Sequence, residues 1–203
     1  MIQKGHIVSD DKKNPLKIIT PEFRGSYVAL LEPRAVSQEK PDDKKYSILM
    51  VLKKDAPGTK DFIKRLEANI QVASQQKHGK PIPKERLKHY PIKDGDHDEN
   101  PDFAGHWLIS ASNKFKPGII NLQGEKLFEA EDVYSGAWYR ASVSPWGWDN
   151  PVGGKGVSLN LHNVVKTKDD EAFTSVSKPE DDFADLLSDL PAASSGADDD
   201  LFT

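Results

Sequence analysis

Residues 132–144 read DVYSGAWYRASVS, and this stretch decides the fold. Successive residues of a β-strand point to opposite faces of a sheet, so the stretch can be analysed by alternation. Its odd-numbered positions form a plausible core face, made of Val133, Ser135, Ala137, Tyr139, Ala141 and Val143. Its even-numbered positions place Tyr134, Trp138 and Arg140 in one row, with Gly136 where a ligand can approach closely. The stretch therefore predicts a strand with one buried face and one aromatic, cationic face.

Two interpretations of the aromatic row remain open. Trp146 and Trp148 follow in a segment rich in proline and glycine, which we expect to be a loop, so three of the four tryptophans lie within residues 138–148. Rings beside basic side chains hold single-stranded nucleic acid without reading its sequence. Aromatic side chains are also usually buried, so Tyr134 and Trp138 equally fit a core, and Trp146 the end of a barrel.

Working outward, β-rich runs at 26–32, 45–54, 106–113, 119–122 and 156–166 predict further strands. Residues 33–44 contain Pro33, Pro41, Asp42 and Asp43 and are expected to hold a polar loop. Residues 59–78 predict a helix, because Phe62, Ile63, Leu66, Ile70 and Ala73 recur on one helical stripe. Residues 80–105 form a long insertion with a short helix around 84–89. The pattern favours a mainly β fold, a five-stranded OB-fold barrel with one inserted helix, and a sandwich is the alternative.

The charge is distributed unevenly along the chain. The formal net charge is −4, yet residues 169–203 carry 11 acids and one base, while residues 1–168 carry 27 bases and 21 acids. A basic body followed by an acidic tail is typical of a polyanion-binding domain with a built-in competitor, and a solubilising tail is the alternative. The tail ends in Asp198, Asp199, Asp200, Leu201 and Phe202, a peptide that could enter a basic aromatic groove or dock on a partner.

The sequence contains no motif that is typical of a catalytic or metal-binding site. The chain has no cysteine, which removes disulfides and thiolate chemistry. Residues 94–99 resemble the start of a calcium loop, but Glu99 stands where glycine is needed and Gly105 where a glutamate is needed. The six histidines form no metalloprotease motif, and no Walker or nucleophile-elbow spacing occurs. We therefore expect no enzymatic activity, no cofactor and no metal, and the absence of a long apolar run predicts no membrane span.

The chain contains FRGSYV at 23–28, LEPR at 31–34, KYS at 45–47, VYSGAWYRASV at 133–143 and KGVS at 155–158. With these segments, residues 23–168 resemble the replicative single-stranded-DNA-binding proteins of tailed bacteriophages. The resemblance implies an OB-fold and an acidic C-terminal tail that modulates DNA binding and contacts replication proteins. Thr203 follows the final aromatic residue, where related tails often end on the aromatic.

The resulting expectation is an N-terminal arm at 1–22, a DNA-binding OB-fold at 23–168 and a flexible acidic tail at 169–203. The expected function is sequence-tolerant coating of single-stranded DNA in phage replication or recombination, in the cytoplasm of an infected bacterium, with the tail recruiting a polymerase, helicase or nuclease. An OB-type module that mainly recruits such a partner is the alternative. The expected DNA contacts are Tyr134, Trp138, Arg140, Trp146, Trp148, Trp107, Tyr46, Lys53, Lys54, Arg34, Lys114, Lys116, Lys155 and Lys166.

Overall fold

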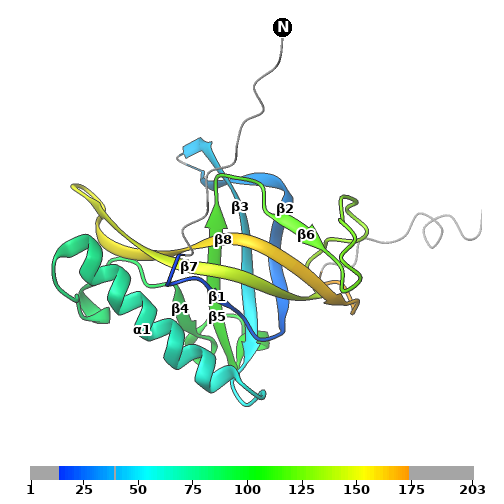
Figure 1. Ribbon diagram of the computed structural model, residues 1–203, viewed down its shortest axis with the longest axis horizontal. Helices are drawn as coiled ribbons and strands as arrows, with labels where there is room; N and C mark the ends of the chain where they lie inside the picture. Colours follow the sequence, from blue (N-terminus) through cyan, green and yellow to red (C-terminus); the bar gives the residue numbers. More distant parts are fainter. Residues whose placement is uncertain (1–13, 39, 174–203) are drawn as a thin grey trace, which may run out of the picture. The chain divides into compact units, whose positions relative to one another are not determined.

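A computed structural model describes residues 14–38 and 40–173. Five of its strands close into a barrel (Figure 1): β2 (Phe23–Ser37), β3 (Lys40–Lys53), β5 (His106–Asn113), β7 (Trp138–Asn150) and β8 (Gly154–Lys168). Around the barrel β2 pairs with β3, β3 with β5, β5 with β8, β8 with β7, and β7 with β2. Only the β5–β8 pair of this ring is parallel. The predicted five-stranded OB-fold barrel with one helix is confirmed.

The inward-facing residues of these strands fill the barrel. Ile48, Met50 and Leu52 of β3 alternate with outward-facing residues and are almost fully buried, as is Ile109 of β5. Ala137, Tyr139, Ala141 and Val143 are buried as predicted from alternation. Residues 132–137, however, precede β7 instead of belonging to it.

The ribbon formed by β2 and β3 is longer than predicted. The expected polar loop at Pro33 and Pro41 is wrong, because both strands run through these prolines to a turn between Ser37 and Lys40. Register shifts separate the pairs Ala29–Ser47, Arg34–Lys45 and Ser37–Lys40. Each proline falls within such an irregular stretch, where its missing N–H costs no regular ladder hydrogen bond.

Strand β7 also extends past the predicted boundary. The segment with Trp146 and Trp148 was expected to be a loop, but β7 continues through it and pairs with β8 as far as Asn150. Pro145 is tolerated because β1 and β2 pair with β7 only between Trp138 and Val143, which leaves the later part of that edge open.

The helix α1 (Thr59–His78) has the predicted bounds and buries the predicted stripe. It packs against the barrel beside β7 (Figure 1). A Cβ on Gly147 would lie 2.6 Å from the Lys77 Cβ and 2.9 Å from the Ala73 carbonyl oxygen, so the bare glycine lets helix and strand meet. No helix within the described ranges has the length and apolar character needed to cross a membrane.

Residues 80–105 lie over the barrel as a series of short elements. These are η1 (Lys84–Arg86), β4 (Ile92–Asp94), η2 (Gly95–His97) and η3 (Pro101–Phe103), and η1 falls where a short helix was predicted. Strand β4 pairs with β5, and Phe103 packs on Val51 and Leu108 on the outside of the barrel. The insertion therefore builds a wall beside the outer face of β3 and β5.

The two remaining strands extend the sheet. Strand β1 (Ile18–Ile19) pairs with β7, and β6 (Gly118–Ile120) pairs with β8. Leu16, Ile18 and Thr20 of the predicted N-terminal arm are buried against the barrel. Residues 1–13 of that arm lie outside the described part of the chain.

Candidate nucleic-acid interface

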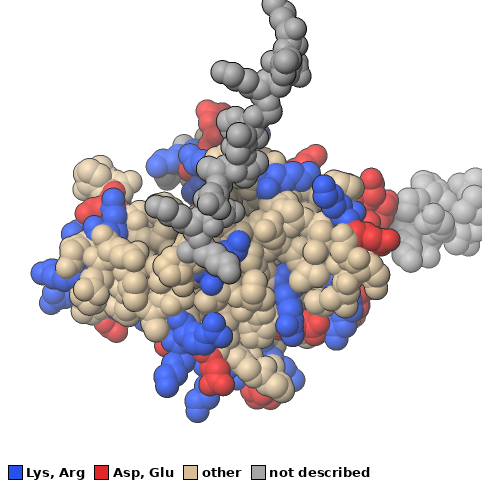
Figure 2. Space-filling view, in the orientation of Figure 1, with Lys and Arg blue, Asp and Glu red and all other residues tan. Residues whose placement is uncertain are grey.

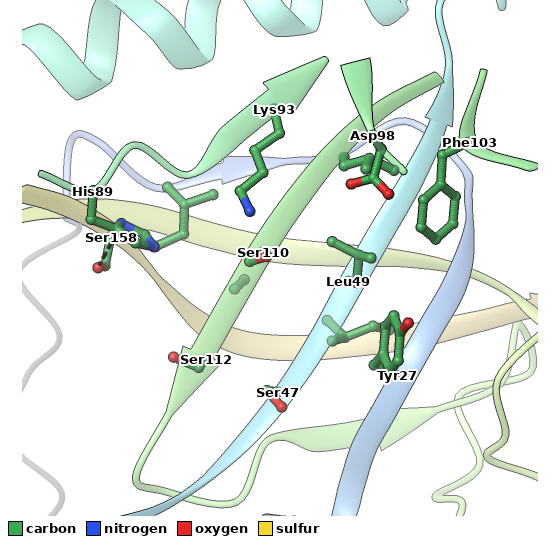
Figure 3. A pocket seen from close by; sticks show the side chains of 14 residues that line it. Tyr27, Ser47, Leu49, His89, Lys93, Asp98, Phe103, Ser110, Ser112 and Ser158 are labelled. Carbon is green, nitrogen blue, oxygen red and sulfur yellow. Dashed lines mark hydrogen bonds between the residues drawn. The ribbon is translucent and has the colours of Figure 1, made fainter. Parts of the chain in front are cut away.

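A cleft of about 400 Å³ crosses the outer face of β3 and β5 (Figure 3). It is lined by Tyr27, Ser47, Ile48, Leu49, His89, Lys93, Asp98, Phe103, Leu108, Ser110, Ala111, Ser112, Ser158 and Leu159. In an OB-fold barrel the face of the second and third strands binds oligonucleotides. Here β3 and β5 are those strands, because they follow β2 in the barrel order.

The floor of the cleft carries small hydroxyl side chains. Ser47 of β3 lies opposite Ser112 of β5, and Leu49 lies opposite Ser110. Ser158 of β8 adds a further hydroxyl at the far side (Figure 3). Such side chains leave room for a ligand and can donate hydrogen bonds to phosphate or sugar oxygens.

Two aromatic rings border one end of the cleft. Tyr27 of β2 is 65% exposed and has a backbone φ of 48°, which is rare for a residue with a bulky side chain. Phe103 extends from η3, and Figure 3 shows its ring on the same side of the cleft as Tyr27. A solvent-exposed ring held in a strained backbone conformation at a cleft is a candidate for ligand contact.

The opposite end holds the cationic and imidazole groups. Figure 3 shows His89 and Lys93 of β4 on this side of the cleft, whereas Asp98, the acid of the lining, lies on the side of Phe103. The His89 Nδ1 donates to the Val157 carbonyl at 2.9 Å, which orients the ring. Trp148 lies behind this end, since its ring centroid is 6.3 Å from that of His89 and its Nε1 donates to the Ser158 Oγ at 2.9 Å.

Three of the expected contacts, Tyr134, Trp138 and Lys166, lie together where β7 begins, beside Arg24 and Lys168. We call Arg24, Tyr134, Trp138, Lys166 and Lys168 the β7 cluster. The Lys166 ammonium lies 5.2 Å from the ring centroid of Tyr134, and that of Lys168 lies 4.4 Å from the ring centroid of Trp138. The buried Tyr139 hydroxyl donates to the Tyr134 carbonyl and accepts from its N–H, which fixes the backbone there.

The β7 cluster contacts acidic residues of the same chain. The Tyr134 hydroxyl donates to Asp169 at 2.8 Å, and the Trp138 Nε1 donates to Asp170 at 2.6 Å. Hydrogen bonds from Lys166 and Tyr134 hold the pKa of Asp169 below its ordinary value, and the bond from Trp138 does the same for the pKa of Asp170. Burial raises the pKa of Tyr134. These acids open the predicted tail, so its first residues lie on the barrel.

The other predicted basic residues do not form one rim. Lys54 pairs with Asp94 and Asp96, Lys114 with Asp43 at 3.7 Å, and Lys155 with Asp149 at 3.6 Å. Arg34 is exposed on the β2–β3 ribbon opposite Lys45, while Lys53 and Lys116 are exposed elsewhere. Figure 2 shows Lys and Arg side chains in separate groups on the face it presents.

The remaining predicted residues are also separated. Arg140 borders a different groove, of about 270 Å³, whose lining includes Ile19, Ile120 and Val165. Trp146 borders a hollow beside α1. Trp107 is half-buried with the Lys54 ammonium 5.0 Å from its ring centroid, and Tyr46 is half-buried on β3. The predicted tail residues 198–202 lie outside the described residues.

Sequence reasoning missed the cleft, because none of the expected DNA contacts lines it. Tyr27, Phe103, His89 and Lys93 come from separate segments that only the closed barrel and its insertion bring together. The serines did leave a signal, because Ser110 and Ser112 alternate with the buried Ile109 and Ala111. Within residues 14–38 and 40–173 no group of three or more histidine or acidic residues is arranged to hold a metal ion.

Comparison with known proteins places the chain in a family. The family described as "Enterobacter phage Enc34, ssDNA-binding protein" matches residues 16–199. The chain belongs to this family. The predicted resemblance to phage single-stranded-DNA-binding proteins is thereby confirmed. A relative, protein p50 of Acyrthosiphon pisum secondary endosymbiont phage 1, is 33% identical in an alignment of 168 residues that covers 78% of this chain and 87% of that protein.

Solved structures agree with this placement. The Enc34 single-stranded DNA-binding protein, solved in complex with ssDNA, is 31% identical and superimposes with a TM-score of 0.67, covering 79% of this chain and 91% of that one. The single-stranded DNA-binding protein gp2.5 of bacteriophage T7 covers 89% of this chain and 98% of its own, with a TM-score of 0.55 and 13% identity. The T7 likeness concerns the fold alone.

Proposed function

We propose that this chain binds single-stranded DNA in the cleft across β3 and β5, with little preference for sequence. The observation that carries the proposal is the lining of that cleft, which combines Tyr27 and Phe103 at one end with Lys93 and His89 at the other. The placement of the cleft on the oligonucleotide-binding face of an OB-type barrel supports it. So does family membership, since the Enc34 relative was solved with ssDNA.

The lining favours sequence-tolerant binding. A base can stack on the exposed Tyr27 ring whatever its identity, because every base has a π face. Ser47, Ser110 and Ser112 can donate hydrogen bonds to the backbone, and Lys93 can neutralise a phosphate. Such contacts are the ones that position a strand and do not read its bases.

We further propose that the protein coats single strands during phage DNA replication and recombination in the infected bacterium, by binding and not by catalysis. Residues 169–203 carry 11 acids and one base, so they can compete with DNA for the basic body and leave their acidic, hydrophobic end for a replication protein when displaced. Competition is supported by the covalent link between the acidic segment and the basic body, because a flexible linker gives a local concentration in roughly the millimolar range.

The test of binding is a titration of the intact chain with oligo-dT and with a duplex of the same length, followed by tryptophan emission. We expect saturable quenching by oligo-dT and much weaker binding of the duplex. Equal affinity for both DNAs, or no binding of oligo-dT at low salt, would contradict the proposal.

A further inference from the structure

The first five residues after β8, 169–173, form a strap over the β7 cluster. The Lys166 ammonium lies 2.6 Å from the Asp169 carboxylate, and the Arg24 guanidinium lies 3.4 Å from that of Asp170. Together with the hydrogen bonds from Tyr134 and Trp138, each carboxylate thus meets one cation and one aromatic donor. Phosphate oxygens of a nucleic acid use donors of the same kinds.

Arg24 also holds the far end of the strap. One guanidinium nitrogen donates to the Glu171 carbonyl at 2.7 Å, and the Arg24 Nε donates to the Gly136 carbonyl at 2.7 Å. The guanidinium carbon lies 4.6 Å from the ring centroid of Phe173 and 5.7 Å from that of Trp138. An arginine close to two rings is an arrangement that also accepts a nucleic-acid base in place of one ring.

The strap lies directly on the backbone. Gly136 has a φ of 113°, and a Cβ there would be 2.3 Å from the Glu171 carbonyl oxygen and 2.8 Å from the Ala172 Cα. The Phe173 N–H donates to the Ser135 carbonyl at 3.0 Å. A glycine at this position leaves room for an extended chain close to the barrel, whether that chain is peptide or nucleic acid.

The lysine of the cluster is buried, whereas the carboxylates of the strap are exposed, and this difference makes the strap replaceable. The Lys166 side chain is 9% exposed, whereas that of Asp169 is 72% exposed and that of Asp170 39%. A buried ammonium needs an anion beside it, because an unpaired buried charge is costly. The exposed carboxylates gain little from the contact, since solvent screens them. The β7 cluster therefore requires an anion, and the strap supplies one that is only weakly held.

The β7 cluster lies near the cleft along β2. Arg24 and Tyr27 lie on the same strand, three residues apart, which is at most about 10 Å. Ser135 joins the two regions, because its Oγ accepts from the Val28 N–H at 3.0 Å while its carbonyl accepts from Phe173. A strand leaving the cleft past Tyr27 would reach Arg24 next.

We propose that the β7 cluster is a second binding site for the same single strand, taking phosphates at Lys166 and Arg24 and a base beside Arg24 and Trp138, where Phe173 lies. In the DNA-free protein the strap fills this site, with Asp169 and Asp170 in place of phosphates and Phe173 in place of a base. The inference rests on the proposed binding of single-stranded DNA in the cleft. It adds where the bound strand continues, and which residues must leave to admit it.

The experiment compares the full-length wild type with the double variant Asp169→Asn/Asp170→Asn on oligo-dT of stepped lengths at low salt. Asparagine keeps the size of each side chain and removes the competing charge. The matched control is Asp55→Asn/Asp61→Asn, which changes the net charge equally at two exposed acids, one in the turn before α1 and one in its first turn. We expect a gain of about three- to tenfold, or up to about 1.4 kcal/mol, for long oligonucleotides only. Trp138→Ala added to the double variant should remove the gain.

The outcomes separate the two proposals. A double variant that binds every length as the control does would overturn the second site, as would a large loss of thermal stability, which would make the strap a structural part. The variant Phe173→Ala keeps both carboxylates, so it should give a smaller gain in affinity for oligo-dT, again for long oligonucleotides only. If Phe173→Ala gives no gain in affinity, that result also contradicts the proposal. If wild type, control and variants all fail to bind oligo-dT, the proposed function itself fails.

Discussion

The indole Nε1 of Trp138 donates a 2.6 Å hydrogen bond to the carboxylate of Asp170, 32 residues further along the chain. The first residues of an acidic segment therefore contact a tryptophan at the beginning of a barrel strand. Lys168 and Arg24 approach the same ring, at 4.4 and 5.7 Å from its centroid. The contact joins the two features that distinguish this sequence, an aromatic, cationic face and an acidic C-terminal segment.

Replacing Trp138 by alanine should weaken binding of oligo-dT by about 1 to 3 kcal/mol, because one stacking ring is lost. Trp138 is only half-buried, so the protein should stay folded. A core tryptophan would instead cost about 3 to 5 kcal/mol of unfolding free energy. Thermal melting run beside the DNA titration distinguishes these results. A folded variant with unchanged affinity would mean that Trp138 does not contact DNA.

Substitutions of Tyr27 should change the free energy of unfolding and the affinity for oligo-dT independently of one another. Its φ of 48° is strained for tyrosine or alanine and unstrained for glycine. Tyr27→Gly should therefore be more stable to unfolding than Tyr27→Ala, by about 1 kcal/mol. Both variants lack the ring and should bind oligo-dT equally weakly. Denaturant melts and titrations of the pair check this, and wild-type affinity in either variant would remove Tyr27 from the interface.

Acid should release the strap. The pKa values of Asp169 and Asp170 are lower in the folded protein than in the unfolded chain. Their contribution to stability is therefore complete above the unfolded pKa of about 4 and is lost as the pH falls through the folded pKa values. The protection of the Phe173 amide, whose N–H is bonded to Ser135, should fall over that window when its exchange is compared with that of an unstructured amide at the same pH. The variant Asp169→Asn/Asp170→Asn should show low protection at every pH, and a protected Phe173 amide in that variant would contradict the account.

Two truncations separate the strap from the rest of the acidic segment. Deleting residues 174–203 removes eight acids and one base and should raise affinity for oligo-dT at low salt. Deleting 169–203 also removes the strap and should raise the affinity further. Both gains should shrink as salt rises, because screening weakens the competition. If the truncated chains bind oligo-dT no more tightly than the intact protein at about 50 mM salt, residues 169–203 do not compete with DNA and can act only by recruiting a partner.

Local patterns predicted the elements, and tertiary contacts decided the site. The stripe from Phe62 to Ala73 and the alternation through Tyr139 and Val143 depend on the geometry of one helix or strand, so sequence alone suffices. The cleft was not predictable in this way, because Tyr27 and Lys93 come to line the same cleft only after the barrel closes and the insertion folds over it. The acidity of residues 169–173 indicated a tail, and nothing local to them indicated their contacts with Arg24 and Trp138.

The salt dependence of oligo-dT affinity tests the central claim, that the single strand lies in the cleft. The measurement compares Lys93→Ala with Lys64→Ala, an equal loss of charge on an exposed face of α1. A lysine that neutralises a phosphate of a single strand contributes about 0.7 to the slope of log affinity against log salt. We predict that Lys93→Ala reduces the slope by about this amount and weakens binding, while Lys64→Ala keeps the wild-type slope. Identical slopes for wild type and both variants would place the strand elsewhere.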